Sequence, residues 1–314
     1  MNKLNTKMKK TLLQLTVACA LALAMTPGAQ AQVLANDAFL TSFGNYSPGA
    51  VATLGPPPTG QNPTVTGFNG PWNVNFQNGG TSTITATPLT YTAPTGYFET
   101  TGAGTLVNAV TGGGIGTNVQ RGLDPSVTTA LAATSGTFYM SFELQIQSTT
   151  GLYQGVEMQA GGVRMFQLGE STSNDFSNTT NFGVTLLHDG GNPNPAFQGS
   201  LGTLDTNAHL FVFEFNLASG NNDTLTAFED PTNLTGATPT GGIQTTITGF
   251  ALPANVNGFG LSTFFNPGTS LSEVRMGNTL ADITGAVPEV PTSSLTLLGL
   301  GVLAVVMVRR KMLA

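Results

Sequence analysis

The chain has 314 residues, of which only 8% are charged, and its formal net charge is −6. Residues 32–286 contain no lysine, and their three arginines against fifteen carboxylates give a formal charge of −12. An acidic segment without a basic patch argues against binding to nucleic acid or to anionic lipid through charge.

The first thirty-one residues have the three parts of a secretory signal peptide. Four lysines precede an apolar stretch at residues 12–25, and Ala29 and Ala31 form an A-x-A cleavage site. We therefore expect the mature chain to begin near Gln32. Cys19 is the only cysteine and lies inside this signal, so we expect neither a disulfide nor thiol catalysis in the mature chain.

Residues 32–286 are enough for one large domain, and their apolar pattern has the two-residue period of β-strands. Apolar and polar side chains alternate at 138–147 and at 210–217. Further strand candidates are residues 155–168, 182–187, 224–228 and 256–264. Gly, Pro, Asn and Asp fill the gaps, and no internal stretch keeps a helical period over a dozen residues. The pattern predicts an all-β sandwich or barrel.

Several short signatures occur in an order that is similar to a known fold family. They are GFNGPWN at 67–73, GTFYMSF at 136–142, NDTLTAFEDP at 222–231 and SEVRMGNTLADI at 272–283. The succession resembles the concanavalin A-like (laminin G-like) jelly roll. This resemblance implies a single β-sandwich in which the first and last strands pair, so that residues 273–283 close the domain. Residues 44–66, rich in Pro and Gly, fit poorly and are expected to form a long surface loop.

The carboxylates lack the spacing that glycan hydrolysis needs on this scaffold. Related glucanases place two nearby carboxylates on one strand, typically as Glu-x-Asp-x-x-Glu. Adjacent residues point to opposite faces of a strand, so Glu229 and Asp230 are not expected to flank one bond. The alternative is a hydrolase whose carboxylates converge only in three dimensions. Its candidates are Glu143, Glu157, Glu170 and Glu214.

The two histidines also lack a catalytic or metal-binding pattern. His188 and His209 do not have a spacing such as H-x-x-x-H, and the chain contains no G-x-S-x-G elbow. We therefore interpret both histidines as loop or strand-edge residues.

Aromatic residues in loop-like segments are candidates for glycan binding. Sugar platforms need aromatic faces for stacking and polar groups for hydroxyls. Trp72, Tyr91 and Tyr153 could serve this purpose. The competing interpretation places Trp72 in the core of the sandwich.

Calcium is the one metal that the sequence leaves open. Sandwiches of the laminin G type often hold Ca²⁺ in loops at one rim, with Asp, Asn and carbonyl oxygens as ligands. Asp175, Asp189 and Asp223 lie in loops of this composition. The competing interpretation is that they only form turns by accepting local backbone hydrogen bonds.

The last twenty-eight residues, 287–314, have three parts. A Pro-Glu motif precedes an apolar segment, predicted as a membrane-spanning helix over 292–308, and a basic cluster follows. The motif residues are Pro288, Glu289 and Pro291, and the basic residues are Arg309, Arg310 and Lys311. The positive-inside rule keeps this basic end cytoplasmic. The order resembles the PEP-CTERM sorting signal of Gram-negative bacteria, with Val290 inserted into the usual Pro-Glu-Pro core. The competing interpretation is an uncleaved membrane anchor.

Many PEP-CTERM proteins carry a body similar to the jelly roll above, so the resemblance extends to most of the chain. It implies passage through the export machinery, a transient stay in the inner membrane and cleavage by an exosortase near residues 288–291. The expected destination is the cell surface or extracellular matrix, in an exopolysaccharide or biofilm setting. We expect a non-enzymatic protein whose jelly roll is a candidate to bind extracellular polysaccharide or a protein partner, between which the sequence does not choose, without a cofactor unless calcium is bound; the alternative is a secreted glycan-active hydrolase.

Overall fold

The computed structural model describes residues 33–41, 46–51, 60–61, 65–101, 103–110, 114–149, 153–161, 163–171, 180–188, 192–264 and 268–285. They belong to one compact unit, Gln32–Ala286. The predicted cleavage-site and sorting residues lie outside the described residues, namely Ala29, Ala31, Pro288, Glu289, Pro291, Arg309, Arg310 and Lys311. No helix among the described residues is long and apolar enough to cross a membrane.

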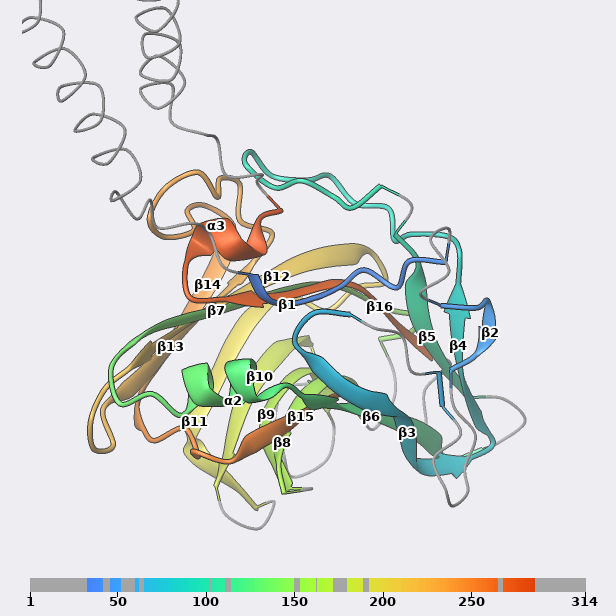
Figure 1. The fold of residues 1–314 in the computed structure, drawn as a ribbon, viewed down its shortest axis with the longest axis horizontal. Coiled ribbons are helices and arrows are strands. Elements are labelled where there is room, and N and C mark those ends of the chain that lie inside the picture. Colours follow the sequence, from blue (N-terminus) through green and yellow to red (C-terminus); the bar gives the residue numbers. More distant parts are fainter. Residues whose placement is uncertain are drawn as a thin grey trace, which may run out of the picture. The chain divides into compact units, whose positions relative to one another are not determined.

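The described strands form two sheets (Figure 1). Sheet A contains β1 (Val33–Asp37), β2 (Gly49–Ala50), β4 (Gly80–Thr85), β5 (Thr105–Val110), β7 (Gly136–Ile146), β12 (Ala208–Leu217), β13 (Asp223–Glu229), β14 (Ile243–Phe250) and β16 (Gly268–Gly277). Its strand order is β14-β13-β12-β7-β16-β5-β4-β2, and β1 also pairs with β16.

Sheet B contains β3 (Phe68–Asn78), β6 (Gly116–Leu123), β8 (Tyr153–Ala160), β9 (Val163–Ser171), β10 (Asn181–His188), β11 (Asn192–Thr203) and β15 (Val256–Phe264), in the order β11-β10-β9-β8-β15-β6-β3. Two short helices complete the described elements: α2 (Pro125–Leu131) follows β6, and α3 (Leu280–Ile283) follows β16.

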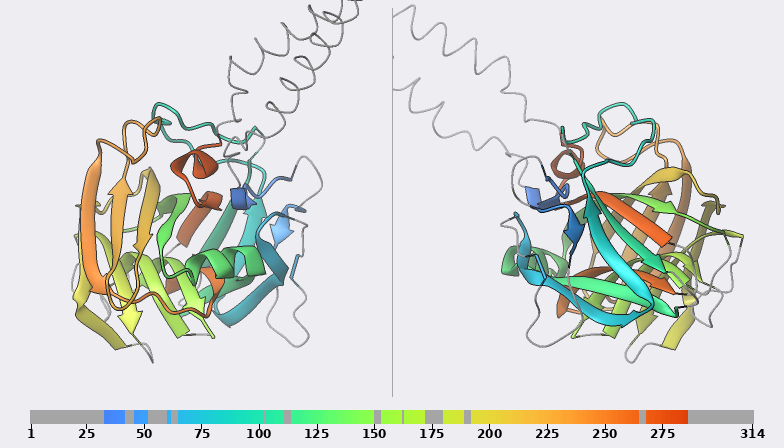
Figure 2. Two further views of the ribbon diagram at one scale, coloured as in Figure 1. Left: turned by 60° about the vertical axis from the view of Figure 1, so that its left-hand side comes forward. Right: turned by 90° about the vertical axis from the view of Figure 1, so that its right-hand side faces the viewer.

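The two sheets pack face to face around a core rich in phenylalanine (Figure 2). The ring of Phe142 on β7 lies 6.5 Å from that of Phe259 on β15, and Phe166 on β9 lies 4.9 Å from Phe213 on β12. All strand pairs within both sheets are antiparallel among the described residues. The predicted all-β jelly-roll sandwich is therefore confirmed, because two antiparallel sheets enclose one apolar layer.

The alternating segments form the strands that their pattern predicts, with one exception. The stretch at 138–147 lies in β7, and the stretch at 210–217 lies in β12. Residues 155–168, however, form two strands, β8 and β9, joined at Gly161. Gly161 has a φ of +59°, a left-handed conformation that allows the chain to reverse there. The single strand expected for 155–168 is therefore wrong.

The first and last strands of the domain pair as the resemblance implied. Strand β1 is antiparallel to β16, with Asn36 opposite Arg275. The segment at 44–66, expected as a surface loop, differs in its described part. Tyr46 and Val51 are buried in the main core, and β2 pairs with β4 at the sheet edge. Burial of these two side chains outweighs the local preference of Pro and Gly for exposed loops.

A second, smaller core covers the outer face of sheet A. Its side chains come from three strands, from loops and from α3: Tyr97, Tyr139, Leu210, Val212, Phe228, Leu234, Leu280 and Ile283. Helix α3 is held by a capping box in which Thr279 and Asp282 satisfy each other's backbone N–H groups. This cover explains why carboxylates on the outer face of sheet A are removed from water.

Candidate functional site

Trp72, predicted as a sugar platform or as a core residue, lies in the core with 1% exposure. Its Nε1 donates to the Tyr46 hydroxyl at 2.9 Å, and that hydroxyl donates to Asp37 Oδ2 at 2.5 Å. Arg121 completes the network, with Nη1 at 3.5 Å from the same carboxylate oxygen. A ring enclosed in this way offers no face to a sugar, so the core interpretation describes Trp72.

The other two predicted aromatic residues do not join Trp72. Tyr91 is half-buried on the outer face of sheet A, with its ring 6.2 Å from that of Tyr97. Tyr153 begins β8, and its side chain lies outside the described residues. The predicted aromatic platform is therefore not assembled from Trp72 and Tyr91.

Of the three predicted calcium residues, only Asp223 lies among the described residues. Its Oδ1 accepts the Ala218 N–H at 2.7 Å, and its Oδ2 accepts the Leu252 N–H at 2.7 Å. Both carboxylate oxygens are thus used to hold two backbone segments, which is the turn role considered as the competing interpretation. Asp175 and Asp189 lie outside the described residues.

The carboxylates proposed for the hydrolase alternative lie on different faces. Glu143 is on the outer face of sheet A, opposite Leu210, whereas Glu157 is on the outer face of sheet B, opposite Gly260. Glu214 lies four residues along β12 from Leu210, about 13 Å away at the rise of a β-strand. The side chain of Glu170 lies outside the described residues. The three described carboxylates do not converge.

Glu157 organises a polar network on the outer face of sheet B. Its Oε1 accepts hydrogen bonds from Asn118 Nδ2 at 2.6 Å and Gln159 Nε2 at 2.5 Å. Its Oε2 lies 2.9 Å from Arg164 Nε, and Asn118 also donates to the Ser262 hydroxyl. These five residues, which we call the Glu157 network, extend over the neighbouring strands β6, β15, β8 and β9.

Polar groups without partners adjoin the Glu157 network. Gln167 stands opposite Glu157 on β9 and is fully buried. Neither its Oε1 nor its Nε2 has a hydrogen-bond partner in the described part of the chain, and the same is true of Asn118 Oδ1 and Gln120 Oε1. Because an unpaired buried polar group costs about 1–3 kcal/mol, this face is suited to a ligand or waters that offer both donors and acceptors.

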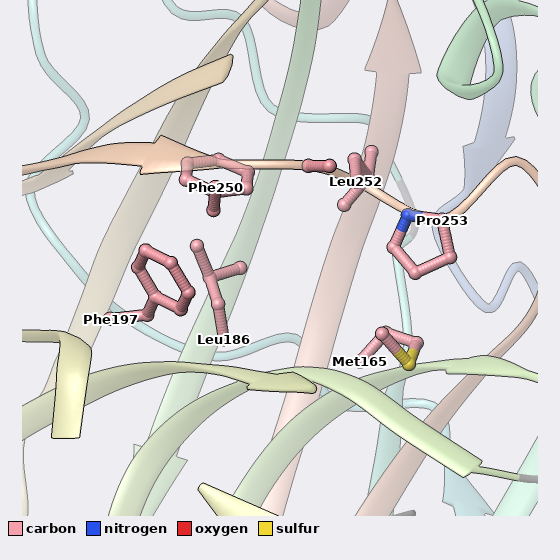
Figure 3. A pocket seen from close by; sticks show the side chains of 7 residues that line it. Met165, Leu186, Phe197, Phe250, Leu252 and Pro253 are labelled. Carbon is pink, nitrogen blue, oxygen red and sulfur yellow. The ribbon is translucent and has the colours of Figure 1, made fainter. Parts of the chain in front are cut away.

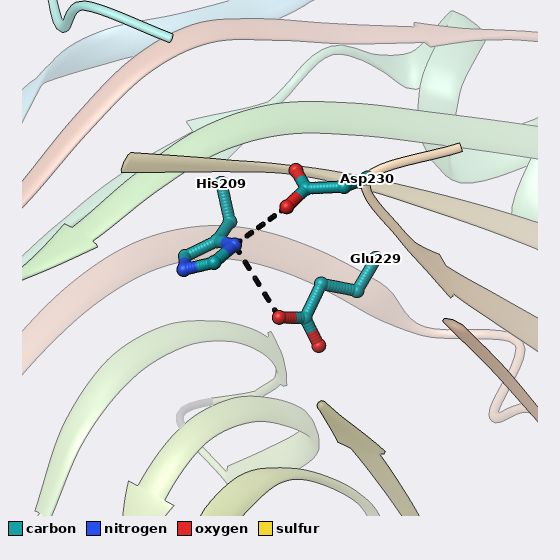
Figure 4. Close-up of side chains that lie close together, drawn as sticks. All are labelled: His209, Glu229 and Asp230. Atoms are coloured by element: carbon teal, nitrogen blue, oxygen red, sulfur yellow. Dashed lines mark hydrogen bonds and ion pairs between the residues drawn. The ribbon is translucent and has the colours of Figure 1, made fainter. Parts of the chain in front are cut away.

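A second polar cluster surrounds His209, where β12 begins and β13 ends (Figure 4). The ring Nδ1 lies 2.7 Å from Asp230 Oδ2 and 3.3 Å from Glu229 Oε1. On the other side of the ring, Nε2 lies 2.9 Å from Asp205 Oδ1. We refer to His209, Asp205, Glu229 and Asp230 as the His209 cluster.

The backbone at Asp230 explains why two adjacent carboxylates meet at one histidine. Asp230 follows the last residue of β13 and has a φ of +47°, in the left-handed region that non-glycine residues rarely adopt. This turn ends the strand alternation, so Glu229 and Asp230 both reach Nδ1. Strand alternation alone did not predict that these two carboxylates would lie on one side of a histidine ring. His209 lies at the start of β12, as the strand-edge interpretation expects, but it contacts three carboxylates there.

The carboxylates determine the charge of His209. Burial alone would lower its pKa, but hydrogen bonds to Asp230 and Asp205 outweigh burial and raise the pKa to about 9. Burial also raises the pKa of Glu229, although the hydrogen bond from the Gly202 N–H opposes that shift. The cluster therefore contains an imidazolium among carboxylates near neutral pH.

An apolar cavity between the sheets carries no comparable chemistry. It has a volume of about 20 Å³, enough for roughly one water molecule. Figure 3 shows the side chains around it, and the lining residues are Met165, Leu186, Phe197, Phe250, Ala251, Leu252 and Pro253. We interpret it as a packing gap at the side of the sandwich.

No family model matches the chain, and no curated protein matches its sequence. Among solved structures, an endo-β-1,4-glucuronan lyase from the fungus Trichoderma reesei is 12% identical, with a TM-score of 0.41 over 67% of this chain and 92% of the lyase. A carbohydrate esterase from the Shiga toxin-encoding bacteriophage phi24B is 11% identical, with a TM-score of 0.38 over 65% and 88% of the two chains. The binding domain of botulinum neurotoxin DC, in complex with rat synaptotagmin II, is 10% identical, with a TM-score of 0.42 over 80% of this chain and 51% of that one. Likenesses at these values support no assignment of activity.

Proposed function

We propose that this protein is an exported, non-enzymatic surface or matrix protein that binds a glycan through the outer face of sheet B. The observation that carries the binding proposal is Gln120, a partly exposed carboxamide on β6 whose Oε1 lacks a hydrogen-bond partner in the described part of the chain. An amide can accept from one hydroxyl and donate to its neighbour, which suits the paired hydroxyls of a sugar.

The surroundings of Gln120 support a polyhydroxylated ligand. Asn118 and Gln159 add further carboxamides on the adjacent strands, and the positions on β15 opposite Gln120 and Gln159 are glycines. Gly258 and Gly260 place no side chain between the carboxamides of β6 and those of β8. Arg164, whose side chain is 33% exposed, supplies a cation at the border of the face and favours a glycan that carries carboxylates.

The test is titration of the purified full-length protein with soluble polysaccharides, acidic and neutral, followed by calorimetry. The variant Gln120→Ala should lose at least tenfold in affinity. Gln244→Ala is the matched control, because Gln244 is exposed on β14 of sheet A and should leave affinity unchanged. Equal effects of the two variants, or depolymerisation of the polysaccharide by the parent protein, would contradict this proposal.

The export and sorting half of the proposal rests on the sequence at both ends. A signal peptide at residues 1–31 would direct export, and the tail at 287–314 would hold the chain in the inner membrane of a Gram-negative bacterium until an exosortase cleaves near Pro288–Pro291. Intact mass should show loss of the tail only in cells that contain the exosortase. A full-length tail in both strains would instead identify a permanent membrane anchor.

A further inference from the structure

We propose that His209, Glu229 and Asp230 form a binding site for one divalent transition-metal ion of the zinc class, with Asp205 orienting the imidazole. One ligand atom from each of the three residues lies within 4.8 Å of the other two. This inference is independent of glycan binding, because the His209 cluster lies on sheet A and the Glu157 network lies on sheet B.

The distances between the ligand atoms suit tetrahedral coordination. Bonds of about 2.0–2.1 Å to nitrogen and oxygen at tetrahedral angles separate neighbouring ligand atoms by roughly 3.3 Å. Nδ1 of His209 already lies 3.3 Å from Glu229 Oε1 and 2.7 Å from Asp230 Oδ2. For its distance to Nδ1, the Asp230 carboxylate must move outward by several tenths of an ångström. Its side chain is 48% exposed, so it has room to do so.

The remaining polar atoms of the three ligands are already held in place. Asp205 Oδ1 engages Nε2 of His209, which leaves Nδ1 as the nitrogen that faces Glu229 and Asp230. The Gly202 N–H donates to Glu229 Oε2 at 2.6 Å, and the Leu210 N–H donates to Asp230 Oδ1 at 2.9 Å. Histidine ligands in metal sites typically donate their other ring N–H to a carboxylate, and ligand carboxylates are themselves hydrogen-bonded. The His209 cluster has both features.

The balance of charge also calls for a cation. Three carboxylates surround a single imidazolium, whose Nδ1 proton a metal ion would displace, and residues 32–286 contain no lysine. The three arginines of this segment are engaged elsewhere: Arg121 with Asp37, Arg164 with Glu157 and Arg275 with Glu273. A divalent ion would neutralise the charge that these side chains leave unbalanced.

The donor set favours zinc over calcium. Calcium takes six to eight oxygen ligands, whereas an imidazole nitrogen with two carboxylates is a common set for zinc and its neighbours. The fourth position would lie on the side of Asp230 that is open to solvent and would take a water molecule. Bound metal would join the start of β12 to the end of β13 and so stabilise the folded protein.

The test is a zinc titration of the full-length protein after removal of metals with a chelator, with calcium as the comparison ion. We expect one zinc per chain, no saturable calcium binding at this site, and a rise in Tm with zinc. Glu229→Gln and His209→Gln should weaken zinc binding at least tenfold. Glu99→Gln, which removes an exposed carboxylate outside the cluster, should leave it unchanged.

Cobalt(II) provides a second measurement that needs no variant. Tetrahedral cobalt with nitrogen and oxygen ligands gives intense visible absorption, and zinc should abolish that absorption by displacing the cobalt. No zinc binding to the parent protein, unchanged binding in His209→Gln, or absence of a tetrahedral cobalt spectrum would each overturn the proposal.

Discussion

Glu143 is buried where its negative charge is unfavourable, and its replacement by glutamine should stabilise the protein. The side chain is 2% exposed on β7, beneath the second core on sheet A. Its Oε1 has no hydrogen-bond partner in the described part of the chain. Burial, with the nearby carboxylates of Glu273 and Glu99, raises its pKa from 4.5 to about 8, although Arg275 opposes the shift.

The sign and size of the effect follow from proton linkage. A carboxyl whose folded-state pKa is raised binds its proton more tightly in the folded protein. Its contribution to the free energy of unfolding is therefore complete below pH 4.5 and is lost as the pH rises through 8. At about 1.4 kcal/mol per pKa unit, the shift corresponds to roughly 5 kcal/mol above pH 8 and to about 3 kcal/mol at pH 7. Glutamine resembles the protonated carboxyl and does not ionise.

Glu143→Gln should therefore match the parent near pH 4.5 and exceed its free energy of unfolding by several kcal/mol at pH 8.5. Urea denaturation at the two pH values measures this difference, and the Tm at pH 8.5 should rise by roughly 10 °C or more. Other titrating groups are common to both proteins and cancel. Glu214→Gln is the control: Glu214 lies on the same face, but its Oε1 accepts a hydrogen bond from Asn216, so we expect no gain. A variant that is less stable than the parent at pH 8.5, or a difference independent of pH, would refute the reasoning.

Three further substitutions test the assignments above. Gln167→Met replaces two unpaired buried groups by an apolar side chain of similar size, so it should stabilise the ligand-free protein by about 1–3 kcal/mol in urea denaturation; destabilisation would mean that the amide is paired. Asp223→Ala leaves the N–H groups of Ala218 and Leu252 without acceptors, so it should lower the free energy of unfolding by about 2–4 kcal/mol. Adding calcium should not raise the Tm of this variant back to that of the parent. Trp72→Phe should lower the free energy of unfolding by about 2 kcal/mol, because a hydrogen bond and side-chain volume are lost, while the affinity for polysaccharide stays constant. A folded variant that has lost this affinity would place Trp72 at the ligand.

The sandwich could be predicted from the sequence because its inner faces are so regular. In β7 and β12 every second residue is a large apolar side chain, and a period of two leaves little choice other than a strand. The reversal at Gly161 and the short helix α2 are less evident, because a single glycine or an Asp-Pro start is also compatible with an ordinary loop.

The outer layers could not be predicted in the same way. Alternation places Glu143 on the polar face of β7. Two segments that are distant in sequence, the loop around Tyr97 and helix α3, nevertheless cover this face. Which face remains in water depends on such long-range contacts, and a local pattern does not contain them. The same limit applies to Gln167, whose lack of a partner is visible only when all neighbouring strands are in place.

The His209 cluster could be predicted in part from the sequence. Strands β12 and β13 form a hairpin around a turn near Gly220, and Phe211 pairs with Glu229 in its register. Counting outward from that turn brings Leu210 opposite Asp230, with His209 one residue further along β12. What the count does not provide is the left-handed backbone at Asp230, which turns two adjacent carboxylates toward the same ring.

The scarcity of cations gives the carboxylates of this protein an unusual set of partners. In the absence of lysine, some buried carboxylates are held by backbone N–H groups instead of by a cation: Asp223 by two, and Asp282 by those of Asn278 and Thr279. Such bonds stabilise an anion without a countercharge, because the donors are fixed dipoles in a region of low dielectric. Backbone hydrogen bonds of this kind are sufficient to stabilise a single isolated carboxylate. At His209 three carboxylates meet around one imidazolium, the backbone supplies one N–H each to Asp205, Glu229 and Asp230, and negative charge remains in excess. A composition with few cations thus leaves the His209 cluster as the place where a divalent ion would compensate the most charge.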